Sequence, residues 1–288
     1  MANVQDYFYV LGVYGEVKTT KSSFSLTAPK PLVYLDLDIG FDRTIPFLMR
    51  RKLTWRKIKQ GDLKTNRTAP VEDILVIEHP LPINFAMKDS ARRVVGYNER
   101  WEALYRDWIT AYELPWVSSV VTDTSTLGWE LCHGGVLDEL KNPKGEPRVS
   151  LTQFEYREPN ARYRALTTGA RESKKNLVLV HHQRDVTEKK VVDNREVDVK
   201  VGETYSGWNR TDAIVDIIVK MTKKQESVLT PGQPPRMATV ASGLIETCGL
   251  TLDAEGRSYR WPDWYTIVNN VRFLRGQIPI TDPKAVQP

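Results

Sequence analysis

The stretch Gly15-Glu-Val-Lys-Thr-Thr-Lys-Ser22 decides how the rest of the chain is interpreted. It departs at one position from the phosphate-binding loop pattern, in which a glycine and four further residues precede Gly-Lys-Ser or Gly-Lys-Thr. Gly15, Lys21 and Ser22 fit this pattern, and Thr20 stands where the second glycine is usual. The stretch is therefore predicted to hold phosphate groups. A surface turn rich in lysine and threonine is the alternative.

The sequence on either side of the loop supports phosphate binding. The apolar run 7–14 predicts a buried strand, and 22–28 predicts a short helix that Pro29 ends. A strand, a loop and a helix N-terminus together aim backbone N–H groups at a polyphosphate. Lys21 would reach the terminal phosphates, and Ser22 would hold Mg²⁺. The residues expected to contact the nucleotide are Gly15, Glu16, Val17, Lys18, Thr19, Thr20, Lys21, Ser22 and Ser23.

Three further apolar runs end in polar side chains. These runs are Pro31–Asp38, Trp116–Asp123 and Leu177–Gln183. In open α/β sheets, ligands bind outside the carboxyl ends of the strands. The four predicted strands would thus bring a lysine, a serine, two aspartates and histidines to one edge, which predicts a nucleoside triphosphate site. Asp123 is expected to order the Mg²⁺ shell.

Composition sets the broad class of the protein. The chain has 288 residues, 41% of them hydrophobic, with a net charge of +5 and a pI near 9.0. These values fit one α/β domain over 1–275 with a flexible tail at 276–288, and they permit a nucleic-acid partner. The two cysteines have no metal-binding spacing, and no signal or membrane segment is recognised. We therefore expect a cytoplasmic protein without a membrane partner.

Several segments interrupt the predicted core. A basic insertion is expected at about 42–73, and loops at about 139–175 and 184–208, of which the second could form a hairpin. An amphipathic helix is predicted from Tyr97 to Tyr112, and a core strand from Thr211 to Met221.

Arginines and aromatic residues alternate between 154 and 171. They are Phe154, Tyr156, Arg157, Arg162, Tyr163, Arg164 and Arg171. Such interleaving is typical of surfaces that bind nucleic acids. A solvated helix face with its aromatic side chains turned inward is the alternative, and at the level of sequence it is preferred.

The ordered set of motifs resembles the phage RecA-like ATPases of AAA type, including the Sak-type single-strand annealing proteins. Three stretches carry the resemblance: Tyr14–Phe24 with the following Pro29–Asp36, Val120–Thr126, and Asn176–His182. With the strand before the loop they span residues 7–185, and a weaker similarity continues to about 250. Each motif is loose, and their order is more specific.

The resemblance implies a RecA-like P-loop core with a mostly parallel sheet flanked by helices, ATP and Mg²⁺ as ligands, and a role in DNA recombination or annealing. It implies that Asp38 polarises the attacking water, although glutamate is usual there. It also implies that His181 or His182 senses the γ-phosphate. Lys220, Lys223 and Lys224 loosely match cations that reach a neighbouring subunit's phosphates.

Two functions remain open at this point. One is a DNA-dependent ATPase that acts on single-stranded DNA as a homo-oligomer, in the host cytoplasm if phage-encoded, with a single-strand binding protein as a possible partner. The other is a degenerate P-loop module that binds nucleotide or partners without turnover, because Thr20 and Asp38 depart from the family pattern.

Overall fold

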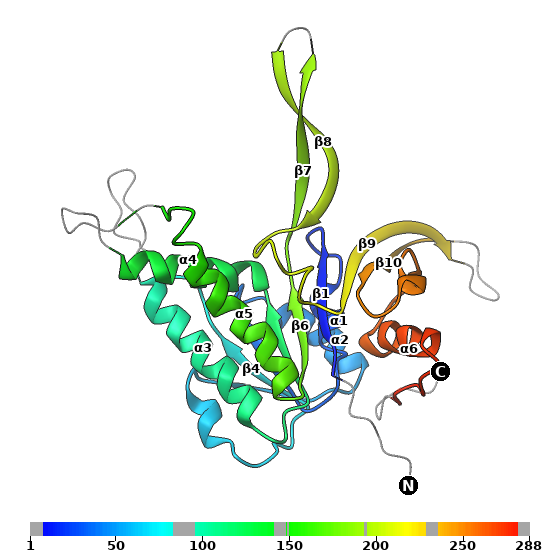
Figure 1. The fold of residues 1–288 in the computed structure, drawn as a ribbon. Helices are drawn as coiled ribbons and strands as arrows, with labels where there is room; N and C mark the ends of the chain where they lie inside the picture. Colours follow the sequence, from blue (N-terminus) through cyan, green and yellow to red (C-terminus); the bar gives the residue numbers. More distant parts are fainter. Residues whose placement is uncertain are drawn as a thin grey trace.

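The fold is built on one sheet of nine strands, seen in a computed structural model (Figure 1). The structure describes residues 8–82, 96–140, 148, 150–192, 195–228 and 236–281. The strands are β1 Val10–Gly15, β2 Leu32–Asp36, β3 Trp55–Ile58, β4 Ile74–Glu78, β5 Ser119–Asp123, β6 Asn176–Val180, β7 Gln183–Val192, β8 Arg195–Tyr205, β9 Ile217–Val228, β10 Arg236–Cys248 and β11 Ser258–Arg260. The α-helices are α1 Lys21–Ser25, α2 Ile45–Arg50, α3 Tyr97–Glu113, α4 Ser125–Glu139, α5 Arg157–Glu172 and α6 Trp264–Leu274.

The strand order is β11-β10-β9-β1-β6-β5-β2-β4-β3. From β9 to β3 all neighbours run parallel, whereas β10 and β11 are antiparallel additions at one side. The predicted fold class is therefore confirmed as α/β with a mostly parallel central sheet flanked by helices. The strands that carry the predicted site, β1, β6, β5 and β2, are consecutive neighbours in it.

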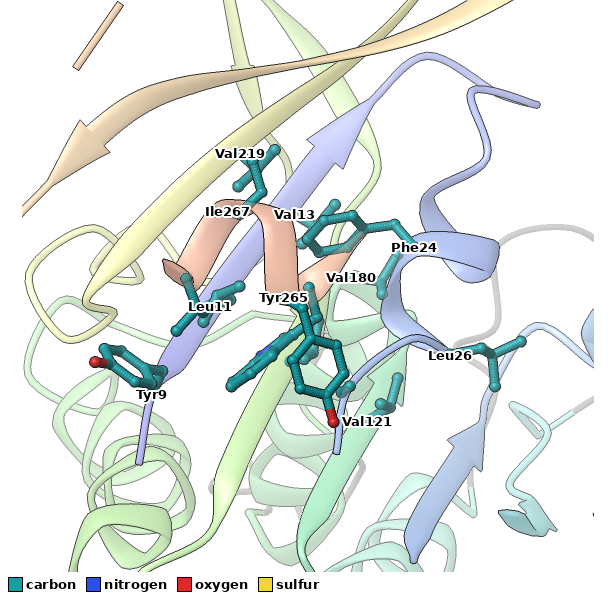
Figure 2. Close-up of a cluster of buried hydrophobic side chains, with 14 of the residues drawn as sticks. Tyr9, Leu11, Val13, Phe24, Leu26, Val121, Val180, Val219, Tyr265 and Ile267 are labelled. Carbon is teal, nitrogen blue, oxygen red and sulfur yellow. The ribbon is translucent and has the colours of Figure 1, made fainter. Parts of the chain in front are cut away.

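Helices cover both faces of the sheet. Successive side chains of a strand point to opposite faces, and here the side chains on both faces are apolar. In β2, Val33 and Leu35 face α3, α4 and α5, while Leu32 and Tyr34 face α1, α2 and α6. Figure 2 shows the second face, where Phe24 and Ile267 meet side chains of β1 and β6. Apolar residues on both faces make these strands continuous hydrophobic runs, which is typical of buried parallel sheets.

The predicted loop at 139–175 is wrong for much of its length, because α5 occupies Arg157–Glu172. Tyr163, Leu166 and Ala170 recur at helical spacing and are fully buried against the sheet. The preferred interpretation of 154–171, a helix face with its aromatic side chains turned inward, is thus confirmed at Tyr163. The basic insertion at 42–73 likewise contains α2 and the edge strand β3. The helix predicted at Tyr97–Tyr112 is confirmed as α3.

Two other boundaries also differ from the sequence prediction. The core strand predicted from Thr211 begins only at Ile217, because the Thr211 hydroxyl donates to the Trp208 carbonyl in a turn. Residues 276–281 of the predicted tail are held to α6, where Asn269 exchanges two hydrogen bonds with the backbone of Ile280. The remaining residues, 282–288, lie outside the described part of the chain.

The segment predicted as a hairpin or loop at 184–208 is a hairpin. Strands β7 and β8 pair antiparallel along their length and form a separate two-stranded sheet. Figure 1 shows this hairpin projecting from the body beyond the carboxyl end of β6. It begins directly after His181 and His182, so the predicted site lies at its base.

Candidate functional site at the carboxyl edge of the sheet

The loop between β1 and α1 has a positive φ at both positions where the phosphate-binding pattern has glycine. Gly15 has φ 154°, and a Cβ there would lie 2.1 Å from the Met221 carbonyl oxygen of β9, so no other residue fits without displacement. Thr20 has φ 68° and ψ 20°, a left-handed conformation that glycine adopts without cost. The loop therefore keeps the backbone shape of the pattern at Thr20, although the residue type differs.

Lys21 is held within the loop. Its Nζ donates to the carbonyl oxygens of Gly15 and Glu16 at 2.8 and 2.7 Å, and its side chain is nearly buried. Burial lowers the pKa of Lys21, whereas the charges of Asp123 and Asp38 raise it. The amine is thus positioned at the N-terminus of α1 by acceptors that a phosphate group can replace.

Asp123 is the acidic centre of the site. It ends β5, is 3% exposed, and accepts a hydrogen bond from the Tyr34 hydroxyl, while the Ser22 hydroxyl lies near enough to stabilise its charged form. Burial raises the pKa of its carboxyl group, and the two hydroxyl donors act in the opposite direction. The structure therefore brings the predicted metal ligands Ser22 and Asp123 into direct contact.

The two acids that follow β2 have different environments. Asp38 is exposed, and its charge acts on Lys21 and Asp123, so it lies at the site. Asp36 is fully buried opposite Asp123 in the β2–β5 ladder and accepts the N–H groups of Gly40 and Phe41. Burial raises the pKa of Asp36 to about 7.

Sequence reasoning assigned no role to Asp36 or to Tyr34, which also contacts Asp123. Asp36 is the last residue of β2. The available signal in the sequence was that Asp36 and Asp38 alternate with leucines at the end of the predicted strand. Strand register, which pairs Asp36 with Asp123, is visible only in the structure.

The histidines end β6 beside the loop. His181 is 1% exposed, and its Nδ1 lies 3.0 Å from the Ser206 carbonyl oxygen. Burial lowers the pKa of His181 to about 4, so the ring is neutral near pH 7. Its Nε2 has no hydrogen-bond partner among the described residues. His182 is half-buried, and its backbone N–H donates to the Thr126 hydroxyl.

The predicted cations of β9 lie close to the chain's own loop. The Lys220 amine lies 3.0 Å from Glu203 Oε2 and 5.9 Å from the centre of the Tyr14 ring. Lys223 is exposed, and its charge contributes to lowering the Lys21 pKa. Whether these lysines also reach a second subunit stays a prediction.

A cavity of about 530 Å³ adjoins the loop on the outer side of α1. Thr20, Phe24, Phe47, Arg51 and Trp261 are among the residues that line it. Trp261 is 56% exposed, so its ring is accessible to a ligand. Half of the lining residues are polar, with Arg50 and Arg51 the charged ones, so the cavity combines aromatic walls with positive charge.

Comparison with known proteins adds little. No protein-family model and no curated protein matches this chain. One similar solved structure is an ATPase from the type III secretion system of pathogenic bacteria. The two are 10% identical over 74% of this chain and 52% of the other, with a TM-score of 0.37. This chain thus spans about half of that protein's length, and a likeness this weak carries no argument about function.

None of the helices in the described part of the chain combines the length and apolar character that a bilayer crossing needs.

Proposed function

We propose that the chain binds a Mg²⁺–nucleoside triphosphate, ATP in the first instance, at the loop Gly15–Ser23. The contact between the Ser22 hydroxyl and the Asp123 carboxylate, beside the Lys21 amine, carries this proposal. It joins the loop to the end of β5 in the way that a shared site for phosphates and a metal ion requires. A lysine-rich surface turn, the alternative, would leave these three side chains in solvent.

The chain's own groups suit the phosphates. Lys21 would exchange the Gly15 and Glu16 carbonyls for phosphate oxygens, and the first backbone N–H groups of α1 would add neutral donors. Gly15 lets the start of the loop pass close to the Met221 carbonyl of β9, which fixes where the loop leaves the sheet.

The oxygen donors also suit Mg²⁺. Ser22 and Asp123 would hold the ion, which binds few protein ligands and keeps waters and phosphate oxygens around it. When bound, it would neutralise phosphate charge.

The cavity beside α1 would take the base. It reaches from Thr20 along the outer side of the helix, so a nucleoside attached to phosphates in the loop would extend into it. The Trp261 and Phe47 rings would provide stacking surfaces.

A more specific proposal is that the bound nucleotide is hydrolysed. Asp38 is exposed and next to the site, so it would orient an attacking water, whereas buried Asp36 organises the turn after β2. Neutral His181, with a free Nε2, would report the γ-phosphate. The competing function is nucleotide binding without turnover, which the non-glycine residue Thr20 favours.

We further propose the RecA-like, Sak-type role in recombination or annealing, with single-stranded DNA as partner and self-association through Lys220 and Lys223. The basic pI of 9.0 and the unpaired arginines described below support the DNA partner. Action together with a single-strand binding protein belongs to the same proposal.

The decisive experiment is ATP binding to Lys21→Ala, measured by calorimetry in the presence of Mg²⁺. Loss of the buried cation should weaken binding by roughly tenfold or more. Lys59→Ala is the control, because Lys59 is exposed and follows β3, the edge strand five places from β1 in the sheet. Equal affinities in the two variants would refute the site. Binding without hydrolysis, with and without single-stranded DNA, would select the module without turnover.

A further inference from the structure

A second cavity lies between the start of α5 and the segment that follows β8. Its volume is about 660 Å³, and it is separate from the cavity beside α1. Its lining includes Trp129, Phe154, Tyr156, Arg157, Asn209 and Arg210. Nothing in the proposed nucleotide site uses these residues.

The aromatic rings of this cavity are accessible; Tyr156 and Trp129 are supported by neighbouring rings, and the Arg157 guanidinium lies over the Phe154 ring, 5.4 Å from its centre. Phe154 is 74% exposed and Tyr156 is 40% exposed. The Tyr156 ring stacks on His133, with centroids 5.3 Å apart, and Trp129 lies against the buried Trp208 at 6.3 Å. Contact of these apolar rings with water is unfavourable, so covering them with a ligand is favoured. Because neighbouring groups hold the rings in place, they present flat surfaces to that ligand.

The arginines of the cavity lack carboxylate partners. Arg157 and Arg210 form no ion pair with any described residue, and no acidic residue lines the cavity. Arg162 and Arg171 on the same helix differ, because Glu139 with Glu158 and Asp216, respectively, neutralise them. The alternating pattern at 154–171 therefore separates into a paired helix face and an unpaired positive end at this cavity.

We infer that this cavity binds single-stranded nucleic acid, with unpaired bases stacking on Phe154 and Tyr156 and phosphates contacting Arg157 and Arg210. Flat rings beside uncompensated positive charge match the two features that every unpaired nucleotide offers, a π-face and a phosphate. Asn209 and Asn160 add amide groups that can bond base edges. A duplex hides its base faces, so single strands are the preferred ligand.

The cavity is connected to the carboxyl edge of the sheet. The Ser206 carbonyl accepts from the Thr126 hydroxyl at 2.9 Å and lies 3.0 Å from His181 Nδ1, while the Ser206 N–H donates to the His182 carbonyl at 2.7 Å. The next residue, Gly207, lines the cavity. If the proposed function holds, a strand bound here would influence the end of β6 and so change ATP turnover; the binding itself does not depend on it.

The test is fluorescence anisotropy of a labelled oligothymidylate of about 20 nucleotides, long enough to exceed typical site sizes. It uses the full chain, without nucleotide and at low salt. Phe154→Ala should weaken binding about fivefold or more, because one stacking surface is lost. Arg210→Ala should reduce the slope of log affinity against log salt by about one.

The controls are matched in exposure and charge. Phe273 of α6 is 71% exposed, so Phe273→Ala removes an equally exposed ring elsewhere, and Arg164→Ala removes an exposed arginine of α5 that does not line the cavity. Both variants should bind as the wild type does. Circular dichroism and thermal unfolding check that every variant is folded.

Three outcomes overturn the inference: no binding at low salt, equal loss in variants and controls, or equal affinity for a duplex with no effect of Phe154→Ala. Lys21→Ala protein separates the two proposals. If it binds the oligonucleotide normally but not ATP, both hold. If it binds both normally, the nucleotide site fails while the nucleic-acid site stands.

Discussion

The carboxyl edge of the sheet and the β7–β8 hairpin meet at His182, yet they use charged residues in opposite ways. At the edge, Lys21, Asp36 and Asp123 are buried and held by named hydrogen bonds. Along the hairpin the charges are exposed and pair with one another, as in the 3.1 Å contact between Lys189 and Glu196.

The two regions therefore differ in what a substitution should do. Buried charges held in a low-dielectric setting are costly to disturb, whereas exposed pairs contribute little. The loop at the edge has a backbone arrangement on which its proposed ligand-binding role depends. The hairpin, a two-stranded ribbon open to solvent (Figure 1), tolerates change. Matched substitutions in the two regions test this contrast.

The largest expected difference comes from the same change, Gly to Ala, in each region. Gly15→Ala places a Cβ 2.1 Å from the Met221 carbonyl oxygen at φ 154°, which should cost about 4 kcal/mol in the free energy of unfolding. Gly202→Ala in β8 meets nothing within 4 Å and should be neutral or slightly stabilising. Denaturant unfolding measures both, and comparable losses at the two glycines would remove the contrast.

The second prediction concerns pH and His181. Its pKa is about 4 in the folded chain, below the ordinary 6.5, so the unfolded chain binds the proton first as pH falls. Burial of the neutral ring therefore contributes fully to the free energy of unfolding above pH 6.5. This contribution is lost progressively as the pH falls to 4, by about 3 kcal/mol in total. His181→Asn, which keeps a donor for the Ser206 carbonyl, should remove this dependence.

The control for this prediction is the difference between the two proteins rather than either curve alone. Burial raises the pKa of Asp36 to about 7, so its protonation stabilises the fold as pH falls and opposes the effect of His181. Asp36 is present in both proteins, and its contribution cancels in the difference. Parallel stability curves between pH 4 and pH 7 would show that His181 is not buried in its neutral form.

The sequence predicted much of the edge because the relevant signals are local. An apolar run followed by Lys21 and Ser22, or ending in Asp123, marks the end of a strand, and parallel strands place their ends together. Asp36 could not be separated from Asp38 in this way, since burial depends on register with β5. The extent of helix α5 was not predicted, because its buried stripe, with Tyr163 at the centre, lies among many charged residues, although a helix face with inward aromatic side chains was the preferred interpretation of this segment.

The cavity near Phe154 shows the same limit. The aromatic and arginine pattern was visible in the sequence, and the preferred interpretation there was a helix face with its aromatic side chains turned inward. Tyr163 turns inward, as one alternative required, whereas Phe154 and Arg157 face a cavity, as the other required. Arg210 lies far from this segment in the sequence but lines the same cavity as Phe154 and Arg157. The structure, and not the local pattern, therefore shows which residues of the segment face the cavity.

The smallest effect is also the one with opposite signs in the two regions. Thr20 has φ 68°, a left-handed conformation that costs a non-glycine residue about 1–2 kcal/mol. Glycine removes this strain and loses part of the gain to the greater freedom of the unfolded chain, so Thr20→Gly should stabilise the fold by about 0.5–1 kcal/mol.

Thr187, by contrast, is exposed in the extended strand β7, where threonine is favoured. Thr187→Gly should destabilise the hairpin by about 1 kcal/mol. The extended backbone of Thr187 is unstrained, so glycine relieves no strain there, and it loses more conformational entropy on folding than threonine does. Amide hydrogen exchange, read separately in α1 and in β7, resolves the two effects even if the hairpin opens on its own. Slower exchange in α1 of Thr20→Gly together with faster exchange in β7 of Thr187→Gly is the expected result. A loss of protection in α1 would mean that the Thr20 side chain contributes more to the loop than its strained backbone costs.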